Sequence, residues 1–315
     1  MAVYKTIGNK LTKLDKLEEN GAWINLVCPS EEEIEEISAK TKLLPEYLRA
    51  ALDEEEVSRI EAEEDQMLII IDVPIAKEKD SYDTIPLGIV LNERYFVTVC
   101  LERNDVIDDF VGEHVKNFYT FKRTRFLFQI FFKTAILFLK YLRLIDRKTN
   151  DIERELHQSM KNKELIKLLS LEKSLVYFTT SLHANEKVME KILRLRGKTN
   201  SEVQLIKMYP EDEELLEDVL IENKQAIEMA HIYSNILSGM MDAFASIISN
   251  NLNIVMKFLA SMTIVLALPT MIASFFGMNV PLPFQENANG FLIVTGGAAG
   301  LSLGAVILLF RKHMF

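Results

Sequence analysis

The chain has 315 residues, of which 49% are hydrophobic and 26% are charged. Its formal net charge at pH 7 is −10, which argues against nucleic acid as a partner and favours attraction of cations. From Ile254 onward the sequence holds three basic residues and one acid, so 33 basic and 45 acidic residues lie before that point. A large acidic region therefore precedes a short apolar one.

Residues 1–120 carry short β-rich runs separated by helical patterns. This alternation predicts a cytoplasmic α/β domain, whose strand order the sequence leaves open. The first residues, MAVYKTIGNKLTKLD, contain no apolar core, and we therefore expect no signal peptide. The acidic segment Glu61–Asp65 predicts a hairpin turn that leads into a buried strand. The predicted strands are Trp23–Cys28, Met67–Val73, Ile85–Leu91 and Tyr95–Leu101.

Two helices are predicted between these strands. Ser30 and Glu33 form a capping-box pattern that opens a helix through Lys42, and a second helix is predicted at Pro45–Asp53. Cys28 and Cys100 are isolated from each other and lie in predicted strands, which indicates reduced, buried thiols in the cytosol.

Helical periodicity runs nearly unbroken after about Lys122. Breaks near Lys161–Asn162 and at Arg196–Ser201 predict two long cytoplasmic helices over residues 121–209. A third helix is predicted from Pro210, because proline suits the first helical turn and the acids that follow suit the positive end of the helix dipole. We expect residues 210–257 to form a stalk that continues to Phe276. Such a helix of ~66 residues is roughly 100 Å long, which indicates several copies bundled in parallel.

Two apolar stretches lie near the C-terminus. Phe258–Phe276 and Gly290–Phe310 contain no charged residue, and each is long enough to cross the ~30 Å hydrocarbon core of a bilayer. We expect membrane-spanning segments at 258–279 and 290–311, an external loop at 280–289 with the single acid Glu286, and a cytoplasmic tail at 312–315. Basic residues flank only the outer ends of the two spans, which places both chain termini in the cytoplasm by the positive-inside rule.

One face of the third helix carries small and polar residues at alternating steps of three and four. This stripe consists of Asn253, Met256, Ala260, Thr263, Ala267, Thr270 and Ser274. Such a stripe can serve helix packing in the membrane, or it can line a pore in which Met256 forms an apolar constriction. In the second span, Gly296, Gly300 and Gly304 form a ridge that we expect to pack closely against the first span.

The first span ends at Gly277, Met278 and Asn279. These residues can form a plain helix cap. Alternatively, Gly277 can end the helix in a left-handed or extended conformation, and Asn279 can then turn its neutral amide oxygen toward a central axis. A ring of such oxygens can hydrogen-bond to the water shell of a cation without removing it, which suits Mg²⁺ because this ion holds its waters tightly.

The segment from Asn235 to Asn279 resembles the CorA family of divalent-cation channels, in which Gly-Met-Asn opens the loop between two C-terminal spans. The resemblance implies an α+β membrane protein with a cytoplasmic α/β/α domain, a long stalk and a homopentameric assembly in the cell inner (plasma) membrane. It also implies influx of Mg²⁺, with Co²⁺ and Ni²⁺ as further ions. The chain departs from the family pattern at three positions. Phe276 stands where the family usually has Tyr, and Ser274 stands where it usually has Gly. Ala267 stands at a position where some members have a bulky apolar residue.

The resemblance also implies roles for individual residues. Asn279 would bind the hydrated ion at the external mouth, Thr270 would form a second polar ring, and Asn253 would mark the inner end of the pore. Met256 and Leu259 would form a hydrophobic gate. Members of the family are inhibited when intracellular Mg²⁺ binds acidic residues between subunits. For that regulatory metal we single out Asp218 with a partner at Asp80 or Asp83 in the loop after Val73, and also Asp242.

The sequence has no Gly-rich phosphate loop, no HExxH pair and no paired cysteines, so we do not expect an enzyme. The five histidines are scattered, and each suits a surface or packing role better than a ligand role; they are His114, His157, His183, His231 and His313. A Zn²⁺ or other transition-metal transporter of the same superfamily and a non-conducting, membrane-anchored helical scaffold remain as alternatives.

Overall fold

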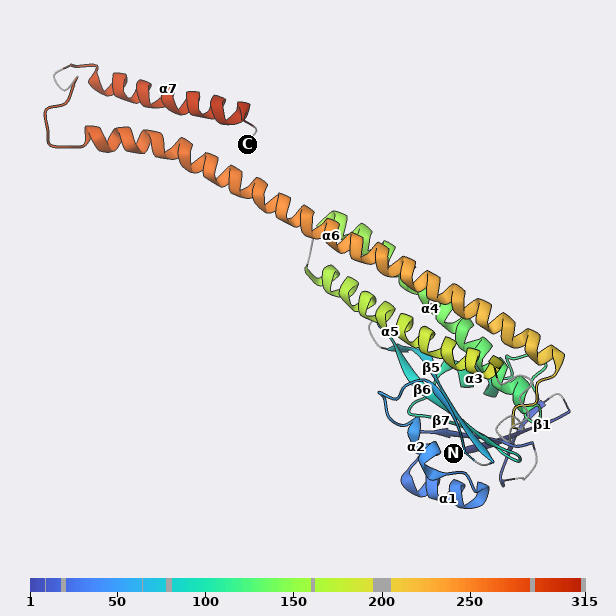
Figure 1. The fold of residues 1–315 in the computed structure, drawn as a ribbon. Coiled ribbons are helices and arrows are strands. Elements are labelled where there is room, and N and C mark those ends of the chain that lie inside the picture. Colours follow the sequence, from blue (N-terminus) through green and yellow to red (C-terminus); the bar gives the residue numbers. More distant parts are fainter. Residues whose placement is uncertain are drawn as a thin grey trace. The chain divides into compact units, whose positions relative to one another are not determined.

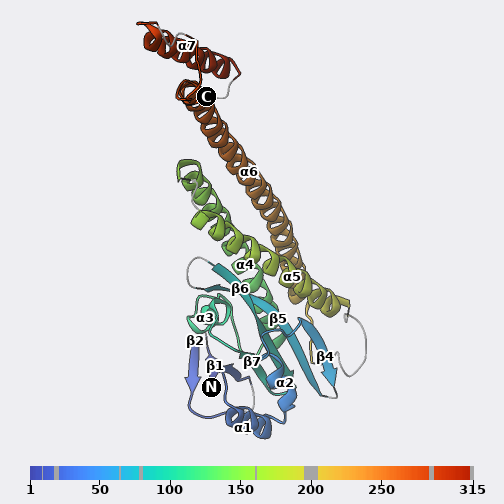
Figure 2. The same cartoon turned by 90° about the vertical axis from the view of Figure 1, so that its left-hand side faces the viewer.

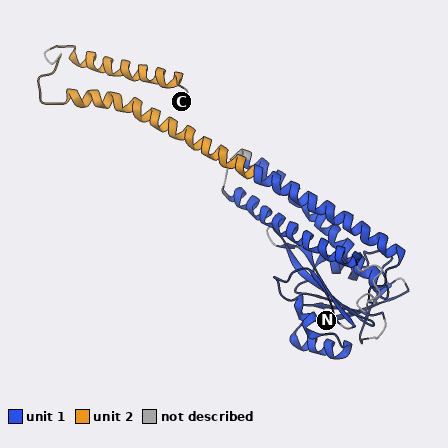
Figure 3. Ribbon diagram, in the orientation of Figure 1, with its two compact units in different colours: residues 1–239 blue, residues 240–315 orange. Residues whose placement is uncertain are grey.

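A computed structural model describes residues 1–8, 10–17, 21–63, 65–77, 81–159, 162–194, 205–283 and 287–312. The chain separates into two compact units, Met1–Gly239 and Met240–Phe315 (Figure 3). Helix α6 (Pro210–Phe276) runs through both of them. The finer division into a domain, cytoplasmic helices and a stalk stays a prediction.

The first unit is built on a seven-stranded sheet with the order β2-β1-β3-β7-β6-β5-β4 (Figures 1 and 2). Neighbouring strands are antiparallel except β3 and β7, which pair in parallel. The strands are β1 (Ala2–Ile7), β2 (Lys10–Leu14), β3 (Trp23–Val27), β4 (Arg59–Glu63), β5 (Gln66–Lys77), β6 (Ser81–Asn92) and β7 (Phe96–Cys100). The four predicted strands are therefore confirmed, with β5 and β6 longer than expected.

Three strands were not predicted. Both β2 and β4 lie at edges of the sheet, and most of their residues are exposed or only half-buried, so neither has a strong apolar pattern. The prediction of a turn over Glu61–Asp65 is wrong for its first half, since residues up to Glu63 belong to β4. Pairing of Ile60 with Ile69 on β5 overrides the acidic composition of this segment, because the buried partner strand fixes the register.

Helices α1 (Glu31–Thr41) and α2 (Pro45–Ala50) cover one face of the sheet. The predicted capping box is confirmed: the Glu33 amide donates to Ser30 Oγ over 3.2 Å, and the Ser30 amide donates to Glu33 Oε2 over 3.2 Å. Helix α2 ends three residues earlier than predicted. The core beneath these helices is apolar and includes Ile34, Leu48, Leu68 and Ile70.

The opposite face is covered by α4 (Arg123–Ser159) and α5 (Asn162–Arg194), with the short α3 (Asp105–Val111) beside α4 (Figure 2). Trp23 packs edge-on against Phe126 of α4, with ring centroids 5.1 Å apart. Asn185 of α5 holds β5, because its Nδ2 donates to the Asp72 carbonyl and its Oδ1 accepts from the Asp72 amide, both over 2.8 Å. The sheet thus lies between two helical layers.

The prediction that both cysteine thiols are buried is right for only one of them. Cys100 is buried, and burial raises its pKa to about 12. Cys28 is exposed, because it follows the end of β3 with a positive φ of 46° instead of continuing the strand.

Two helices are long and apolar enough to cross a membrane by length and composition. Helix α6 has 67 residues, close to the ~66 predicted for a helix that continues from Pro210 to Phe276. Helix α7 (Gly290–Arg311) matches the second predicted span. Almost none of the apolar window of either helix is buried within the chain.

Candidate functional site

Helix α6 ends at the Gly-Met-Asn tripeptide in an ordinary helical turn. The Gly277 amide donates to the carbonyls of Ala273 and Ser274 over 3.0 and 3.2 Å, and the Met278 amide donates to the Phe275 carbonyl over 3.3 Å. Gly277 is not among the residues with a positive φ, so the left-handed conformation, one of the two predicted for it, is wrong. An added Cβ at this position would meet only these two carbonyl oxygens, at 3.4 and 3.5 Å. Met278 and Asn279 are both exposed.

The predicted polar stripe lies on one unbroken helix, and all of its members are exposed. The side chain of Met256 is 58% exposed and that of Leu259, beside the stripe, is 52% exposed. Within the part of the chain that the structure describes, nothing covers these residues. The stripe is therefore free to face other copies of the helix.

The two threonines of the stripe use their protons on their own helix. Thr263 Oγ1 donates to the Leu259 carbonyl over 2.8 Å, and Thr270 Oγ1 donates to the Leu266 carbonyl over 2.9 Å. A hydroxyl whose proton is used in this way presents its oxygen lone pairs outward. Both threonines can thus act as acceptors toward a cation or toward its bound water.

The glycine ridge of α7 does not have the predicted packing role in this chain. A Cβ added at Gly296, Gly300 or Gly304 would meet no atom within 4 Å. The buried residue of α7 is Ala298, which lies two positions from Gly296 and Gly300. Two residues correspond to about 200° of helix rotation, so the ridge and the buried position lie on opposite sides of α7.

Among the described residues, the predicted regulatory carboxylates form no group of three that could hold a metal ion. Asp218 and Asp242 are exposed on α6, and Asp80 lies outside the described residues, as does Glu286 of the external loop. Asp83 lies in strand β6 and not in a loop, since β5 and β6 extend to Lys77 and Ser81. Its Oδ2 is 2.9 Å from Lys77 Nζ, and its Oδ1 accepts the Thr84 amide over 2.9 Å.

The described part of the chain contains no group of three or more His, Cys, Asp or Glu side chains placed so that they could hold a metal ion. The pairing of Asp83 with Lys77 was missed by sequence reasoning. The pairing depends on where β5 ends and the antiparallel strand β6 begins, and no pattern in the sequence fixes these two points.

The chain was compared with known proteins. The family described as "CorA-like Mg2+ transporter protein" matches residues 18–312. The cobalt/magnesium transport protein CorA of Methanocaldococcus jannaschii is 28% identical over 307 residues, which covers 93% of this chain and 89% of the relative.

Solved structures give the same result. The complete structure of the CorA magnesium transporter from Methanocaldococcus jannaschii matches with a TM-score of 0.83 and 26% identity, over 100% of this chain and 98% of that one. The cytoplasmic domain of ZntB from Vibrio parahaemolyticus matches with a TM-score of 0.58 over 80% of this chain and 97% of that one, but at 14% identity this likeness concerns the fold alone. With a family match that spans nearly its full length, this chain belongs to the CorA-like Mg²⁺ transporters, which are ion transporters and not enzymes.

Proposed function

We propose that this chain forms a membrane channel for hydrated divalent cations, with Mg²⁺ as its main ion and Co²⁺ and Ni²⁺ as further ions. The observation that carries the proposal is the exposed polar stripe on α6, which runs without a break up to Gly277, Met278 and Asn279. Similarity to the cobalt/magnesium transport protein supports the choice of Mg²⁺ and Co²⁺.

The assembly is a homopentamer around an axis that the α6 stripe faces. One copy leaves the stripe uncovered, and a parallel bundle would place Asn253, Thr263 and Thr270 in polar rings around that axis. The outward lone pairs of the threonines suit a cation that keeps its water shell. Rings of Met256 and Leu259 would form an apolar gate that closes by excluding water.

The channel lies in the cell inner (plasma) membrane with both chain termini in the cytoplasm. Lys257 stands before the first span, and Arg311 and Lys312 end the second, so the basic residues lie on one side. The loop at 280–289, which contains Glu286, is then external. Asn279 lies at its start, where ions enter.

Cytoplasmic Mg²⁺ regulates the channel through acids between subunits. Asp218 and Asp242 are exposed on α6, where copies of the stalk would repel each other without bound divalent ions. The partner of Asp218 on a neighbouring copy is Asp80 or Asp83. In the second case Mg²⁺ would take the place of the Lys77 ammonium beside Asp83.

The role of Asn279 is tested by ion flux into proteoliposomes with the full chain. Asn279→Ala should abolish saturable Mg²⁺ flux, because the variant removes the amide ring at the mouth. Asn289→Ala is the matched control, since Asn289 precedes α7 and its side chain makes no capping bond. Both variants should elute at the size of the native oligomer. Normal flux through Asn279→Ala would exclude this residue from the mechanism.

The same assay separates the competing functions. If the native protein conducts no ion at any internal Mg²⁺ concentration, a non-conducting scaffold replaces the channel. If Zn²⁺ flux exceeds Mg²⁺ flux and Mg²⁺ does not compete, a transition-metal transporter replaces it.

Regulation is tested by proteolysis of the full chain in millimolar Mg²⁺. Asp218→Ala should reduce the protection that Mg²⁺ gives to the native protein, because the variant removes a carboxylate ligand. Glu217→Ala is the control, an exposed acid next to Asp218 on the same helix. Equal protection of the Asp218 variant and the native protein would rule out a regulatory site there.

A further inference from the structure

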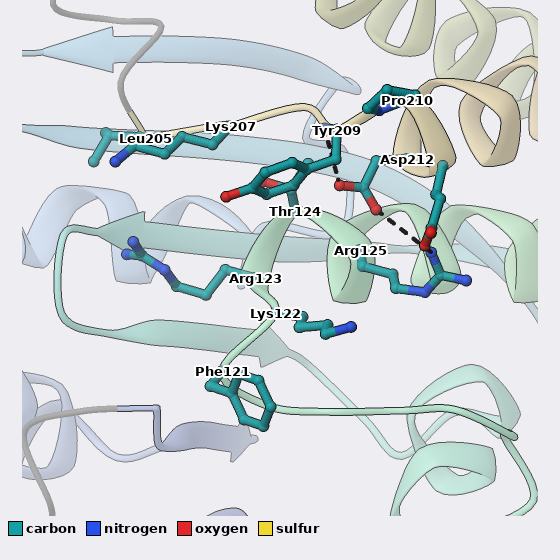
Figure 4. Close-up of a pocket in the computed structure, with 11 residues that line it drawn as sticks. Phe121, Lys122, Arg123, Thr124, Arg125, Leu205, Lys207, Tyr209, Pro210 and Asp212 are labelled. Carbon is teal, nitrogen blue, oxygen red and sulfur yellow. Dashed lines mark hydrogen bonds and ion pairs between the residues drawn. The ribbon is translucent and has the colours of Figure 1, made fainter.

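The first unit contains a cavity of about 690 Å³ at the starts of two long helices (Figure 4). One wall is the segment Phe121–Arg125, which begins α4, and the other is the segment Leu205–Asp212, which begins α6. Four basic side chains and two acids line it: Lys122, Arg123, Arg125, Lys207, Glu211 and Asp212. The lining is thus net positive in a chain whose net charge is −10.

Both acids of the lining are already paired with the same arginine. Arg125 Nη1 lies 3.5 Å from Glu211 Oε2 and 3.7 Å from Asp212 Oδ1. Asp212 is only 5% exposed and also accepts the Tyr209 amide over 3.2 Å. Arg125 offsets one of the two acidic charges on this side of the cavity, and the excess positive charge of the lining lies with Lys122, Arg123 and Lys207.

Arg123 is the most confined of these three cations. Its guanidinium donates to the Asn92 carbonyl, which is a neutral acceptor. Burial lowers its pKa and the charge of Glu93 raises it. Lys122 Nζ lies 5.4 Å from the centre of the Tyr119 ring. Among the described lining residues, no carboxylate forms an ion pair with Arg123 or Lys207.

Figure 4 shows that the side chains of Arg123 and Lys207 extend in the same direction, with the hydroxyl of Tyr209 between them. A guanidinium, an ammonium and a phenol hydroxyl can all donate to the oxygens of one anion. The positive end of the 37-residue helix α4 lies in the same wall. Phe121 and Tyr209 add exposed aromatic faces.

We propose that this cavity binds a nucleoside di- or triphosphate, with Arg123, Lys207 and Tyr209 on the phosphates and an aromatic side chain against the base. Its volume lies within the range of small-molecule pockets, about 300–1,000 Å³. Since Mg²⁺ reduces the negative charge of a polyphosphate, the cationic cavity prefers the metal-free form. The site does not depend on the proposed channel function.

Calorimetric titration of the full-length oligomer with ATP in metal-free buffer tests the proposal. ATP should bind saturably, and Lys207→Gln should weaken this binding about tenfold through loss of a charged hydrogen bond. Lys187→Gln, the removal of an exposed lysine on α5 that does not line the cavity, should leave binding unchanged. Arg123→Gln should weaken binding at least as much. This variant also loses the contact with Asn92, so if its folding is impaired, Lys207→Gln carries the test.

Other titrations identify the ligand class. Tripolyphosphate should bind more weakly than ATP, and equal affinity would overturn the nucleoside part of the proposal. Excess Mg²⁺ should weaken ATP binding, and an unchanged affinity would overturn the charge argument. Absence of saturable ATP binding would overturn the site. A Lys207→Gln variant that changes the oligomer size without changing ATP affinity would instead assign the cavity to a contact between copies.

Discussion

The two units of the chain place apolar side chains in opposite environments. In the first unit Leu68, Ile70 and Phe96 are 0% exposed. In the second, Leu266, Leu303 and Phe310 are 61%, 64% and 71% exposed. Leucine and phenylalanine occur in both sets, so hydrophobicity alone does not decide burial.

The difference follows from the solvent that each unit meets. A sheet with two helical layers removes its apolar side chains from water by packing them against each other. A helix whose backbone hydrogen bonds are internal can leave its apolar side chains outward when lipid or other copies of the helix surround it. The exposed apolar side chains of the second unit therefore fit a membrane protein, in which lipid or other copies of the helix cover them in place of a core within the chain.

The largest expected effect on this contrast comes from replacing one phenylalanine side chain by alanine in each unit. Phe96→Ala should reduce the free energy of unfolding by about 3–5 kcal/mol, because it opens a cavity beside Phe126, whose ring centre lies 4.5 Å away. Phe310→Ala should leave this unfolding transition unchanged. The fluorescence of Trp23, the one tryptophan of the chain, reports unfolding of the first unit in urea. Similar losses in both variants would contradict the contrast.

A smaller test concerns helix starts. Ser30→Ala should cost about 1 kcal/mol of stability, because the hydroxyl accepts the Glu33 amide at the start of α1. Asn289→Ala should cost nothing measurable, since the Asn289 side chain makes no such bond at the start of α7. Urea midpoints of both variants check the difference. Equal shifts would show that the residue before α7 in the second unit contributes as much to stability as the residue before α1 in the first unit.

The smallest expected effect concerns a confined carboxyl group. Burial raises the pKa of Asp72, while hydrogen bonds from Ser181 and Ser58 lower it and offset part of that effect. A carboxyl with a raised pKa in the folded state binds its proton more tightly there than in the unfolded chain. Its contribution to stability therefore falls as pH rises from the unfolded value of 3.8 through the folded pKa.

Asp72→Asn should consequently make the first unit slightly more stable at neutral pH and flatten its pH dependence above 3.8. Unfolding midpoints at several pH values measure this. Asp65→Asn, which changes an exposed acid in a turn, is the control and should keep the native profile. A loss of stability at neutral pH in the Asp72 variant would mean that its ionised form is favoured by folding.

Much of the fold could be predicted from local patterns. The capping box fixed the start of α1, and Pro210 and Phe276 were correctly identified as the ends of α6. The strongly apolar strands were identified by their composition. Strands β1, β2 and β4 were not predicted, because they form through pairing with strands elsewhere in the sheet.

The sequence by itself determined two charge-free spans, a polar stripe on one helix face and the tripeptide at its end, because helical periodicity and charge are local properties. Only the tertiary structure decided that Asp83 pairs with Lys77, that the glycine ridge of α7 is open, and that basic residues from the starts of α4 and α6 share one cavity. These features depend on contacts between residues far apart in the chain or on which side of a helix is buried. No periodicity within a single segment contains that information.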